Sequence, residues 1–315
     1  MAVLVTGGMG FIGLHVVGQL LDIGEDVVVT WHHSWRVHPR WADEVGKRVL
    51  AERLDVASPH EVMNVTLRHK VSAVVYLASP VVGTSTVTQD YTTNVGGLVN
   101  ALEAASLAGV RRFTYLSSST VYFGLKAGPY REDAPLPLES RSAIEAFKKA
   151  GEIVALHYAD RLGLSLGIIR PRAVYGPLYY SMANLPSRLA HAAARGTEPD
   201  YGPAGVPYAD DGNDYTNVQD SAELVRIIHQ ADKLPHRIYN AGNGREVTVQ
   251  ALIDAVRSAV PDANIPVKPG KSPTPPQPDN YLDLTRARED FGWEPKFPIE
   301  KGLPAYIDWL RSHPQ

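Results

Sequence analysis

The chain has 315 residues, 44% hydrophobic and 21% charged, which is typical of a globular protein with one large domain and a smaller one. Its net charge of -3 provides no basic excess, so the composition does not favour binding to nucleic acid or to an anionic membrane. The absence of cysteine excludes disulfides, thiolate metal sites and a cysteine nucleophile.

The N-terminal segment, Met1 to Gly13, lacks the basic region and the apolar core of a secretory signal. No apolar run in the sequence approaches the roughly 18 to 20 residues that a membrane-spanning helix requires. We therefore expect a cytoplasmic protein that does not act at a membrane.

The first half of the chain alternates short segments rich in β-branched residues with longer helical patterns, which is typical of repeated β-α-β units. The predicted strands are residues 3–5, 26–30, 49–54, 73–77, 112–117 and 165–170. The predicted helices between them are residues 12–21, 87–107 and 142–161. This order predicts an α/β fold with a doubly wound parallel sheet that is covered by helices on both faces.

After Gly176 and Pro177 the pattern changes to a region rich in tyrosine, glycine and proline. Further helices are predicted at residues 185–194, 221–230 and 249–260. Residues 268–279 contain five prolines, which cannot sustain a helix or a central strand, so an extended surface crossing is predicted there. We expect a first domain over residues 1–176 and a smaller lobe over residues 177–315, with a possible return of the chain to the first domain.

A predicted strand, a glycine turn and a helix start open the chain, because Val3 to Thr6 is followed by Gly7-Gly8-Met9-Gly10-Phe11-Ile12-Gly13. Glycine at positions 7, 10 and 13 allows a tight turn, a close approach of the backbone to a pyrophosphate, and close packing of helix on strand. Free N–H groups at the helix start favour the same anion. The pattern predicts a Rossmann-type dinucleotide site at Gly7, Gly10, Phe11, Ile12 and Gly13. The alternative is a glycine-rich turn without a ligand.

Several further segments along the chain have the form of known sequence motifs. They are Leu54-Asp55-Val56, Tyr76-Leu77-Ala78, Asn94-Val95-Gly96-Gly97, Ser117 to Tyr122, Lys148 to Glu152, Arg170-Pro171, Val174-Tyr175-Gly176-Pro177, Asp214 to Asp220 and Asp290-Phe291-Gly292-Trp293. With the glycine turn, these segments resemble the extended short-chain dehydrogenase/reductase family, which includes epimerases and dehydratases, from residue 3 to about residue 310. The resemblance implies a Rossmann fold with a smaller C-terminal substrate-binding lobe.

The resemblance also implies cofactor contacts outside the glycine turn. It implies that Asp55 and Val56 lie beside the adenine. It further assigns Leu77, Ala78 and Ser79 to the ribose and phosphates, and Pro171 to the nicotinamide. Each of these residues could instead serve packing, and Asp55 could be a turn former at a strand end.

The end of the second predicted strand concerns the choice between NAD and NADP. Family members that bind NAD usually end this strand with an acidic residue that holds both ribose hydroxyls. In this chain residues 31–36 contain no carboxylate. His33, Ser34 and Arg36 would instead hold a 2′-phosphate through charge-assisted hydrogen bonds. We therefore expect NADP, with NAD as the alternative if Arg36 simply faces water.

The family carries out its chemistry with a serine, a tyrosine, and a lysine four residues after the tyrosine. The resemblance assigns the serine to Ser118, four residues before Tyr122, with Thr120 helping to orient the substrate oxygen. The segment from Phe147 to Glu152 resembles the run around the family lysine, which makes Lys148 the residue that holds the nicotinamide ribose. Ser118 could also be no more than a polar residue at a strand end.

The catalytic tyrosine of the family is missing, because Ile144 occupies its position and residues 138–150 contain no tyrosine. On a helix, residues 144 and 148 share a face, so an isoleucine would point where a phenol should meet the substrate oxygen. Any hydride transfer must then take its proton from Ser118, from Thr120, from a water or ribose hydroxyl relayed by Lys148, or from the substrate.

Two further departures concern the substrate. Nucleotide-sugar members of the family have an asparagine and an arginine where this chain has Ala173 and Asn213, and residues 209–214 are acidic enough to repel a diphosphate. Aromatic and thioether side chains in the segments expected at the cleft would suit a planar or partly apolar ligand. They are Tyr179, Tyr180, Met182, Tyr201 and Tyr208, and the alternative is that they are ordinary surface residues.

Three functions are therefore considered. The first is an atypical NAD(P)-dependent ketoreductase or dehydrogenase that acts on a carbonyl or alcohol of a non-nucleotide small molecule. The second is a nucleotide-sugar epimerase or dehydratase, and the third is a catalytically silent dinucleotide-binding sensor or scaffold. No metal site is predicted. The resemblance also implies a homodimer through the helices near residues 94–107 and 142–161.

Overall fold

The computed structural model describes residues 2–33, 35–80, 85–274 and 276–313. The chain forms two compact units. Unit 1 comprises Met1–Gly124, Pro135–Arg170 and Ala222–Tyr239, and unit 2 comprises Leu125–Ala134, Pro171–Ser221 and Asn240–Gln315. The assignment of substrate binding to residues 177–315 stays a prediction.

A seven-stranded sheet with the order β3-β2-β1-β4-β5-β6-β8 forms the centre of unit 1. Its strands are β1 (Ala2–Thr6), β2 (Asp26–Trp31), β3 (Val49–Arg53), β4 (Val71–Tyr76), β5 (Arg112–Leu116), β6 (Leu166–Pro171) and β8 (Ile238–Ala241). The five neighbouring pairs from β3 to β6 are parallel. The order reverses between β1 and β4, which is the position where open α/β sheets bind ligands at the carboxyl ends of their strands. The predicted doubly wound parallel sheet is confirmed.

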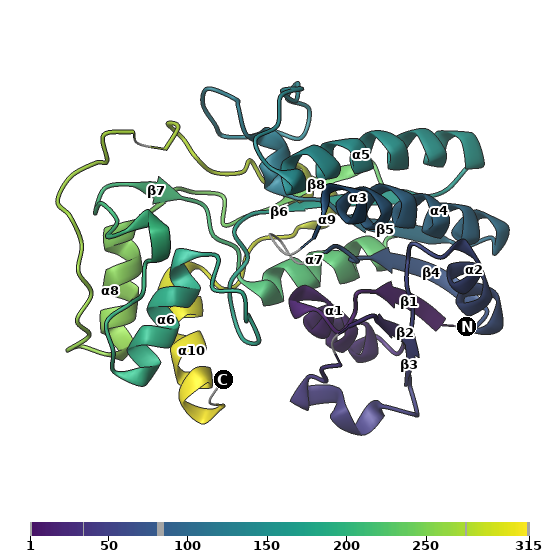
Figure 1. The fold of residues 1–315 in the computed structure, drawn as a ribbon, viewed down its shortest axis with the longest axis horizontal. Coiled ribbons are helices and arrows are strands. Elements are labelled where there is room, and N and C mark those ends of the chain that lie inside the picture. The colour runs from purple at the N-terminus through teal and green to yellow at the C-terminus, as the bar shows by residue number, and fades with distance from the viewer. Residues whose placement is uncertain (1, 34, 81–84, 275, 314–315) are drawn as a thin grey trace. The chain divides into compact units, whose positions relative to one another are not determined.

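Helices cover both faces of this sheet (Figure 1). One layer contains α2 (Pro59–Arg68), α4 (Gly97–Leu107) and α5 (Ala143–Leu162), which pack side by side. On the other face α1 (Phe11–Asp22) meets α7 (Val218–Gln230), where Nε of Arg226 donates to Oε1 of Gln19 at 3.2 Å. The strands β1 and β2 are apolar and buried almost throughout because both faces are covered.

The predicted continuous helix over residues 87–107 is wrong in its middle. The structure has α3 (Val87–Tyr91), then a π-helical turn over Thr92–Gly96, and then α4. The hydroxyl of Tyr76 donates to the carbonyl of Thr93 at 3.0 Å, which gives a backbone group of the widened turn a partner from the sheet. Such π turns inside helices are frequent at functional sites.

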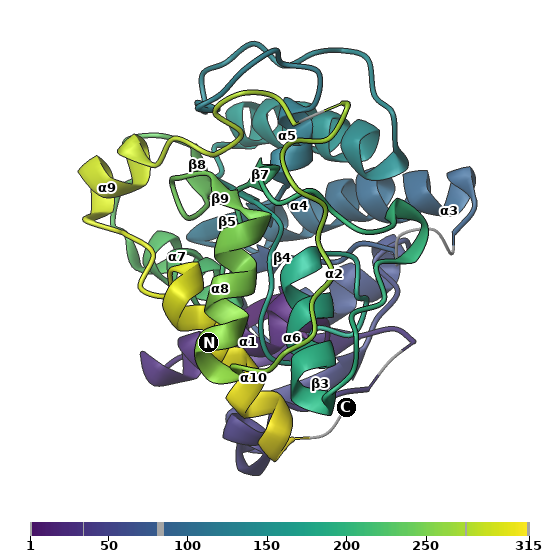
Figure 2. The ribbon, with the colours of Figure 1, turned by 90° about the vertical axis from the view of Figure 1, so that its left-hand side faces the viewer.

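Unit 2 consists mainly of three helices that pack against one another, α6 (Leu185–Arg195), α8 (Val249–Ala259) and α10 (Ile299–Ser312) (Figure 2). The strands β7 (Gly212–Asn213) and β9 (Val247–Thr248) form a short antiparallel pair, and α9 spans Thr285–Phe291. The described residues between 268 and 279 contain no helix and no named strand, in agreement with the prediction from their prolines. Within the described ranges, no helix is both long and apolar enough to cross a bilayer.

Candidate cofactor-binding and catalytic site

The glycine turn after β1 is held by contacts that a side chain would destroy. Gly7 has a positive φ of 67°, and its amide donates to Oγ1 of Thr30 at 3.2 Å. A Cβ atom on Gly13 would lie 2.6 Å from both the carbonyl oxygen of Gly7 and Cα of Gly8. Gly10 is the N-cap residue of α1 and provides no side-chain acceptor for the amides of the first helical turn.

The end of β4 lies directly beside this turn. The amides of Leu77 and Ala78 donate to Oγ1 of Thr6 at 3.2 and 3.3 Å. A Cβ atom on Gly7 would be only 3.1 Å from the backbone of Ala78. The structure therefore brings together the glycine turn and the segment Leu77–Ala78, both of which the sequence assigned to the cofactor.

Asn94 is a polar residue whose role the sequence did not define. It lies in the π turn, is buried, and accepts from the hydroxyl of Ser79 at 3.0 Å while its Nδ2 donates to the carbonyl of Asp90 at 2.9 Å. Asn94 therefore orients Ser79, a predicted cofactor residue. An asparagine within an otherwise helical pattern is the signal that could have found it.

The residues predicted at the adenosine end lie after β2 and β3. His33 and Arg36 are exposed, whereas Ser34 lies outside the described residues. Nε2 of His32 lies 3.9 Å from Oδ2 of Asp55. Oδ1 of Asp55 also accepts from the amide of Ala57 at 2.9 Å, so this carboxylate does form a turn, as the alternative interpretation expected.

Val56 is a buried neighbour of Asp55 whose packing requires glycine on the facing helix. The side chain of Val56 is 6% exposed, and a Cβ atom on Gly97 would lie 2.6 Å from its Cγ2. Nδ2 of Asn100 donates to the carbonyl of Val56 at 2.9 Å. These contacts anchor the segment after β3 to α4.

Ser118 and Thr120 follow β5 and start the short 3-10 helix Ser119–Tyr122. Oγ of Ser118 accepts from the amide of Thr120 at 3.2 Å, which leaves the hydroxyl proton of Ser118 free to donate elsewhere. Oγ1 of Thr120 is buried and has no hydrogen-bond partner among the described residues. Two hydroxyl groups are thus available at the carboxyl end of the central sheet.

Lys148 reaches the same strand end from α5. Its Nζ donates to the carbonyl of Leu116 at 2.7 Å and lies 5.0 Å from the centroid of the Tyr115 ring. Burial lowers the pKa of Lys148 to about 8, and the negative charge of Glu152 partly opposes this shift. The predicted lysine and the predicted serine are therefore anchored within two residues of each other on the chain, at Leu116 and Ser118.

Position 144 offers no acid or base. Ile144 lies in the first turn of α5 and is half-buried. The adjacent Glu145 is buried, and its Oε1 forms an ion pair with Nζ of Lys149 at 2.9 Å. Its other oxygen accepts from the amide of Arg141 at 3.1 Å, so both oxygens of this carboxylate already have partners.

A buried network around the ion pair of Glu152 and Arg170 was not predicted from the sequence. Glu152 accepts from the hydroxyl of Ser117 at 2.5 Å, and from Nε and Nη2 of Arg170 at 2.9 and 2.5 Å. Nη1 of Arg170 donates to the hydroxyl of Tyr122 at 2.7 Å. Burial disfavours the charged form of Arg170, but the hydrogen bond and charge of Glu152 outweigh it and raise the pKa. The network ties β5, β6 and α5 together.

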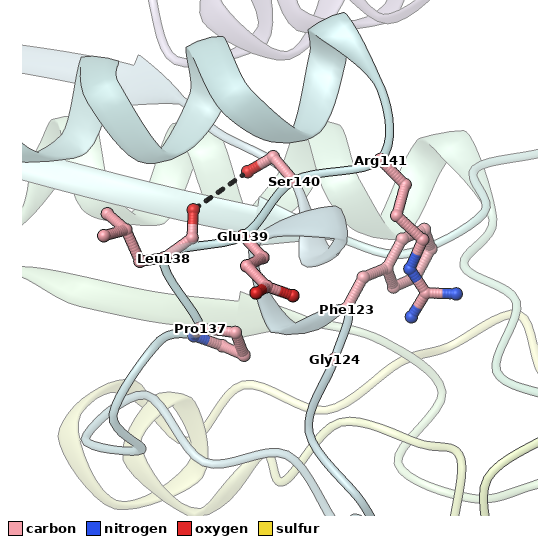
Figure 3. A pocket seen from close by; sticks show the side chains of 7 residues that line it. All are labelled: Phe123, Gly124, Pro137, Leu138, Glu139, Ser140 and Arg141. Carbon is pink, nitrogen blue, oxygen red and sulfur yellow. Dashed lines mark hydrogen bonds between the residues drawn. The ribbon is translucent and has the colours of Figure 1, made fainter.

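A pocket of about 730 Å³ lies in unit 1, next to the end of the 3-10 helix and before the first turn of α5 (Figure 3). Its lining residues are Phe123, Gly124, Pro137, Leu138, Glu139, Ser140 and Arg141. Side chains of both charges, an aromatic ring and apolar groups thus surround one space that adjoins the segments of Thr120 and Ile144.

The predicted cleft residues of unit 2 have varied surroundings. The hydroxyl of Tyr201 donates to the carbonyl of Pro266 at 2.7 Å, and Nζ of Lys268 lies 5.0 Å from the centroid of the Tyr208 ring. Tyr180 is exposed. Tyr201 and Tyr208 therefore have packing partners within unit 2, which supports the structural alternative for these two residues.

Comparison with known proteins gives a consistent picture. A sequence profile described as the NAD dependent epimerase/dehydratase family matches residues 3–242. The UDP-glucose 4-epimerase of Mycolicibacterium smegmatis is 30% identical over 330 residues, which cover 100% of each chain.

Solved structures are also similar over the full length. A UDP-glucose 4-epimerase of Thermotoga maritima, solved with UDP-glucose, has a TM-score of 0.84 and 25% identity, with 100% of each chain covered. The structure of MoeE5 in complex with UDP-glucuronic acid and NAD has a TM-score of 0.79 and 25% identity, with 99% of each chain covered.

Proposed function

The chain belongs to the NAD dependent epimerase/dehydratase family, as the resemblance in its sequence indicated, and we propose that it transfers a hydride between a nicotinamide cofactor and a carbonyl or alcohol of a small molecule. The observation that carries this proposal is the arrangement at the end of β5. Lys148 is bound to the carbonyl of Leu116, and the hydroxyls of Ser118 and Thr120 follow directly on the chain.

The residues of unit 1 fit a dinucleotide. The turn of Gly7, Gly10 and Gly13 would hold the pyrophosphate, because its backbone is too close for side chains and the first amides of α1 are uncapped. Leu77, Ala78 and Ser79 would line the ribose and phosphates, and Lys148 would hold the nicotinamide ribose. The bound nicotinamide would supply or accept the hydride.

We propose a preference for NADP, which rests on the residues after β2. His33 and Arg36 are exposed there, and residues 31–36 contain no carboxylate. Cationic groups favour the 2′-phosphate through charge-assisted hydrogen bonds. Titration of the protein with NADPH and NADH should show tighter NADPH binding, and Arg36→Ala should remove the difference. Equal affinities in the unchanged protein would assign NAD instead.

The remaining side chains can support the chemistry without a tyrosine. With a pKa of about 8, Lys148 is mostly charged at neutral pH and can hold a ribose hydroxyl as a proton relay. The hydroxyl of Ser118 would donate to the oxygen that gains negative charge during reduction. Thr120 offers a second hydroxyl on the same segment.

We propose that the substrate is a non-nucleotide small molecule, because the chain has Ala173 and Asn213 where nucleotide-sugar members have an asparagine and an arginine. Asp210 and Asp211 add negative charge to the same segment.

A nucleotide sugar is the second candidate. The relatives described above are named as UDP-sugar enzymes or were solved with UDP-sugars, and they match this chain over its full length. Calorimetric titration with UDP-glucose and dTDP-glucose separates the candidates. Micromolar binding would select the epimerase or dehydratase function.

Single-turnover hydride transfer tests the main proposal, with candidate carbonyl compounds and protein loaded with reduced cofactor. Ser118→Ala should lower the rate on the order of 10² to 10³, because one donor to the developing oxyanion is lost. Ile144→Val should change the rate little. Ser258→Ala, in α8 of unit 2, is the control and should have no effect. Cofactor binding without turnover of any carbonyl class would select the silent binder.

We also propose a homodimer through α4 and α5. Leu107 and Ile153 on these helices are large apolar side chains that are 72% and 68% exposed, and their burial would favour association through this layer. Sedimentation analysis at several concentrations should give the dimer mass, and Ile153→Asp should shift the population toward the monomer.

A further inference from the structure

Arg172 is a buried cation of unit 2 that directly follows β6. Only 4% of its surface is exposed. Its Nε and Nη2 donate to Oδ1 of Asn213 at 3.0 and 2.8 Å, and Nη2 also donates to Oδ1 of Asn280. The guanidinium carbon lies 5.3 Å from the centroid of the Tyr130 ring. Two amide oxygens and an aromatic face thus fix the orientation of this side chain.

Among the described residues, no carboxylate accepts a hydrogen bond from the side chain of Arg172. The charge of Asp214 acts on it, but Asp214 already accepts from the amides of Asn243 and Leu282 at 2.6 and 3.0 Å. Burial lowers the pKa of Arg172, and the charge of Asp214 opposes the shift only in part. Buried charges in proteins are normally paired, so Arg172 lacks the compensation that such a group requires.

One nitrogen of the same side chain, Nη1, differs from the other two. Nη1 of Arg172 is buried and makes no hydrogen bond among the described residues. An unsatisfied buried donor in a native protein calls for a specific explanation such as a bound ion, a ligand or a water. The next residue, Ala173, has a positive φ of 38°, a conformation that residues with a Cβ atom rarely adopt.

The place of Arg172 in the fold favours a bound ligand as the partner of Nη1. It stands at the carboxyl end of a strand of the parallel sheet, the edge at which such sheets bind ligands. It is also hydrogen-bonded to Asn213 through both Nε and Nη2. A guanidinium therefore stands beside residue 213, although residue 213 itself is neutral.

We propose that Nη1 of Arg172 binds an oxyanion of the substrate, a phosphate or a carboxylate, and that this arginine selects anionic substrates. The inference rests on the proposed function for the identity of the reaction, but the anion site itself belongs to unit 2. The two oxygens of a phosphate or carboxylate suit a guanidinium that is already oriented by Asn213 and Asn280. The residue is a determinant of binding and does not take part in proton transfer.

Calorimetry on the full-length protein, with and without NADPH, tests this inference. The probes are UDP, inorganic pyrophosphate and benzoate, which represent a nucleotide diphosphate, a free phosphate and a planar carboxylate. Arg172→Met should weaken binding of the anion that the unchanged protein takes by roughly 10- to 100-fold, the loss typical of a hydrogen bond to a charged group. Arg257→Met, an exposed arginine of the same unit, should change nothing.

A second variant protects the test against a failure to fold. Asn213→Asp would place a carboxylate against Arg172 and pair it, so the protein should fold with an unchanged or raised Tm but bind the anion at least 10-fold more weakly. A merely structural arginine would not produce this combination. Asn213→Asp with unchanged anion affinity would overturn the proposal.

The remaining outcomes are also decisive. Binding of UDP with pyrophosphate would identify a nucleotide diphosphate, whereas binding of benzoate alone would identify a carboxylate substrate. Failure of all three probes to bind the unchanged protein, or equal binding to Arg172→Met, would mean that Nη1 is satisfied by water and would reject the inference. NADPH affinity should be the same in all variants, so a protein that binds the anion but no cofactor would reject the proposed function alone.

Discussion

Arg170 and Arg172 are two residues apart on the chain and have opposite surroundings. Arg170, in unit 1, is paired twice with Glu152, and the pKa of its guanidinium is raised. Arg172, in unit 2, is held by amide oxygens, its Nη1 has no hydrogen-bond partner among the described residues, and its pKa is lowered. The charge of Arg170 is compensated within the fold by its carboxylate partner, whereas Arg172 lacks such a partner and is proposed to bind the oxyanion of a ligand.

Lys148 belongs with Arg172 in this comparison. Both are buried cations whose side-chain hydrogen bonds with the described residues go to uncharged oxygens, and both have a pKa lowered by burial. Glu152 and Arg170, also in unit 1, form an ion pair with each other and have further hydrogen bonds to Ser117 and Tyr122. The candidate site of unit 1 therefore combines the ion pair of Glu152 and Arg170 with Lys148, a cation that no carboxylate pairs and that could bind the cofactor.

The largest effect on stability is expected from breaking the buried ion pair between Glu152 and Arg170. Glu152→Ala would leave Arg170 buried without its carboxylate, which should lower the free energy of unfolding by about 3 to 5 kcal/mol. Urea denaturation of the cofactor-free protein measures this loss. Glu103→Ala, an exposed glutamate on α4, is the control. If Glu152→Ala lowered the free energy of unfolding by less than about 1 kcal/mol, the pairing of Arg170 with a carboxylate would not distinguish it from Arg172.

An effect of the opposite sign on stability is expected at Lys148, a buried cation of unit 1 whose hydrogen bond goes to a backbone carbonyl. Lys148→Met should abolish hydride transfer but raise the free energy of unfolding at pH 7 by up to roughly 3 kcal/mol, because burial lowers the pKa from 10.5 to about 8. A lysine with a lowered pKa contributes stability above pH 10.5 and loses it as the pH falls through 8. The gain of the variant should therefore shrink as the pH rises from 8 toward 10.5.

Lys149→Met is the matched control for this measurement. Lys149 is also buried, but it pairs with Glu145 at 2.9 Å, so its removal should destabilise the protein. Thermal unfolding of both variants between pH 7 and pH 10 provides the comparison. If Lys148→Met were as destabilising as Lys149→Met at pH 7, Lys148 would have to be regarded as a structural residue.

A moderate effect on stability is expected from a change in the packing of Gly151, the residue before Glu152. A Cβ atom on Gly151 would lie 2.4 Å from the hydroxyl oxygen of Tyr115, so Gly151→Ala should cost about 1 to 3 kcal/mol of unfolding free energy. Gly96→Ala is the control, since a Cβ atom there would meet nothing within 4 Å. Equal stabilities of the two variants in urea denaturation would show that Tyr115 can move aside freely.

The smallest effect is expected beside Arg172. Ala173 has a φ of 38°, and asparagine tolerates this left-handed conformation better than alanine does. Ala173→Asn should therefore raise the free energy of unfolding by about 1 kcal/mol or less, provided that the new side chain reaches water or a polar partner. A stability loss of similar size would indicate that the surroundings of Arg172 exclude a polar neighbour.

Much of the fold was predictable from local sequence patterns. The six predicted strands and the glycine turn were found because buried parallel strands are continuous apolar runs and because glycine is required where backbones approach closely. The short seventh strand of the main sheet, Ile238–Ala241, and the helices Pro59–Arg68, Thr285–Phe291 and Ile299–Ser312 were not predicted. The π turn was also missed, since the sequence of residues 92–96 satisfies a regular helical pattern.

The sequence by itself identified Ser118, Lys148 and Ile144 as the positions that the family resemblance assigns to the serine, the lysine and the tyrosine, and these assignments stay predictions. The tertiary structure decided which charges are paired. Glu152 meets Arg170 across 18 residues, and Asn280 meets Arg172 across 108, so neither partnership is visible in a local pattern. Burial and pairing set whether a charge stabilises the fold or stays available for a ligand, and both depend on segments that only folding brings together.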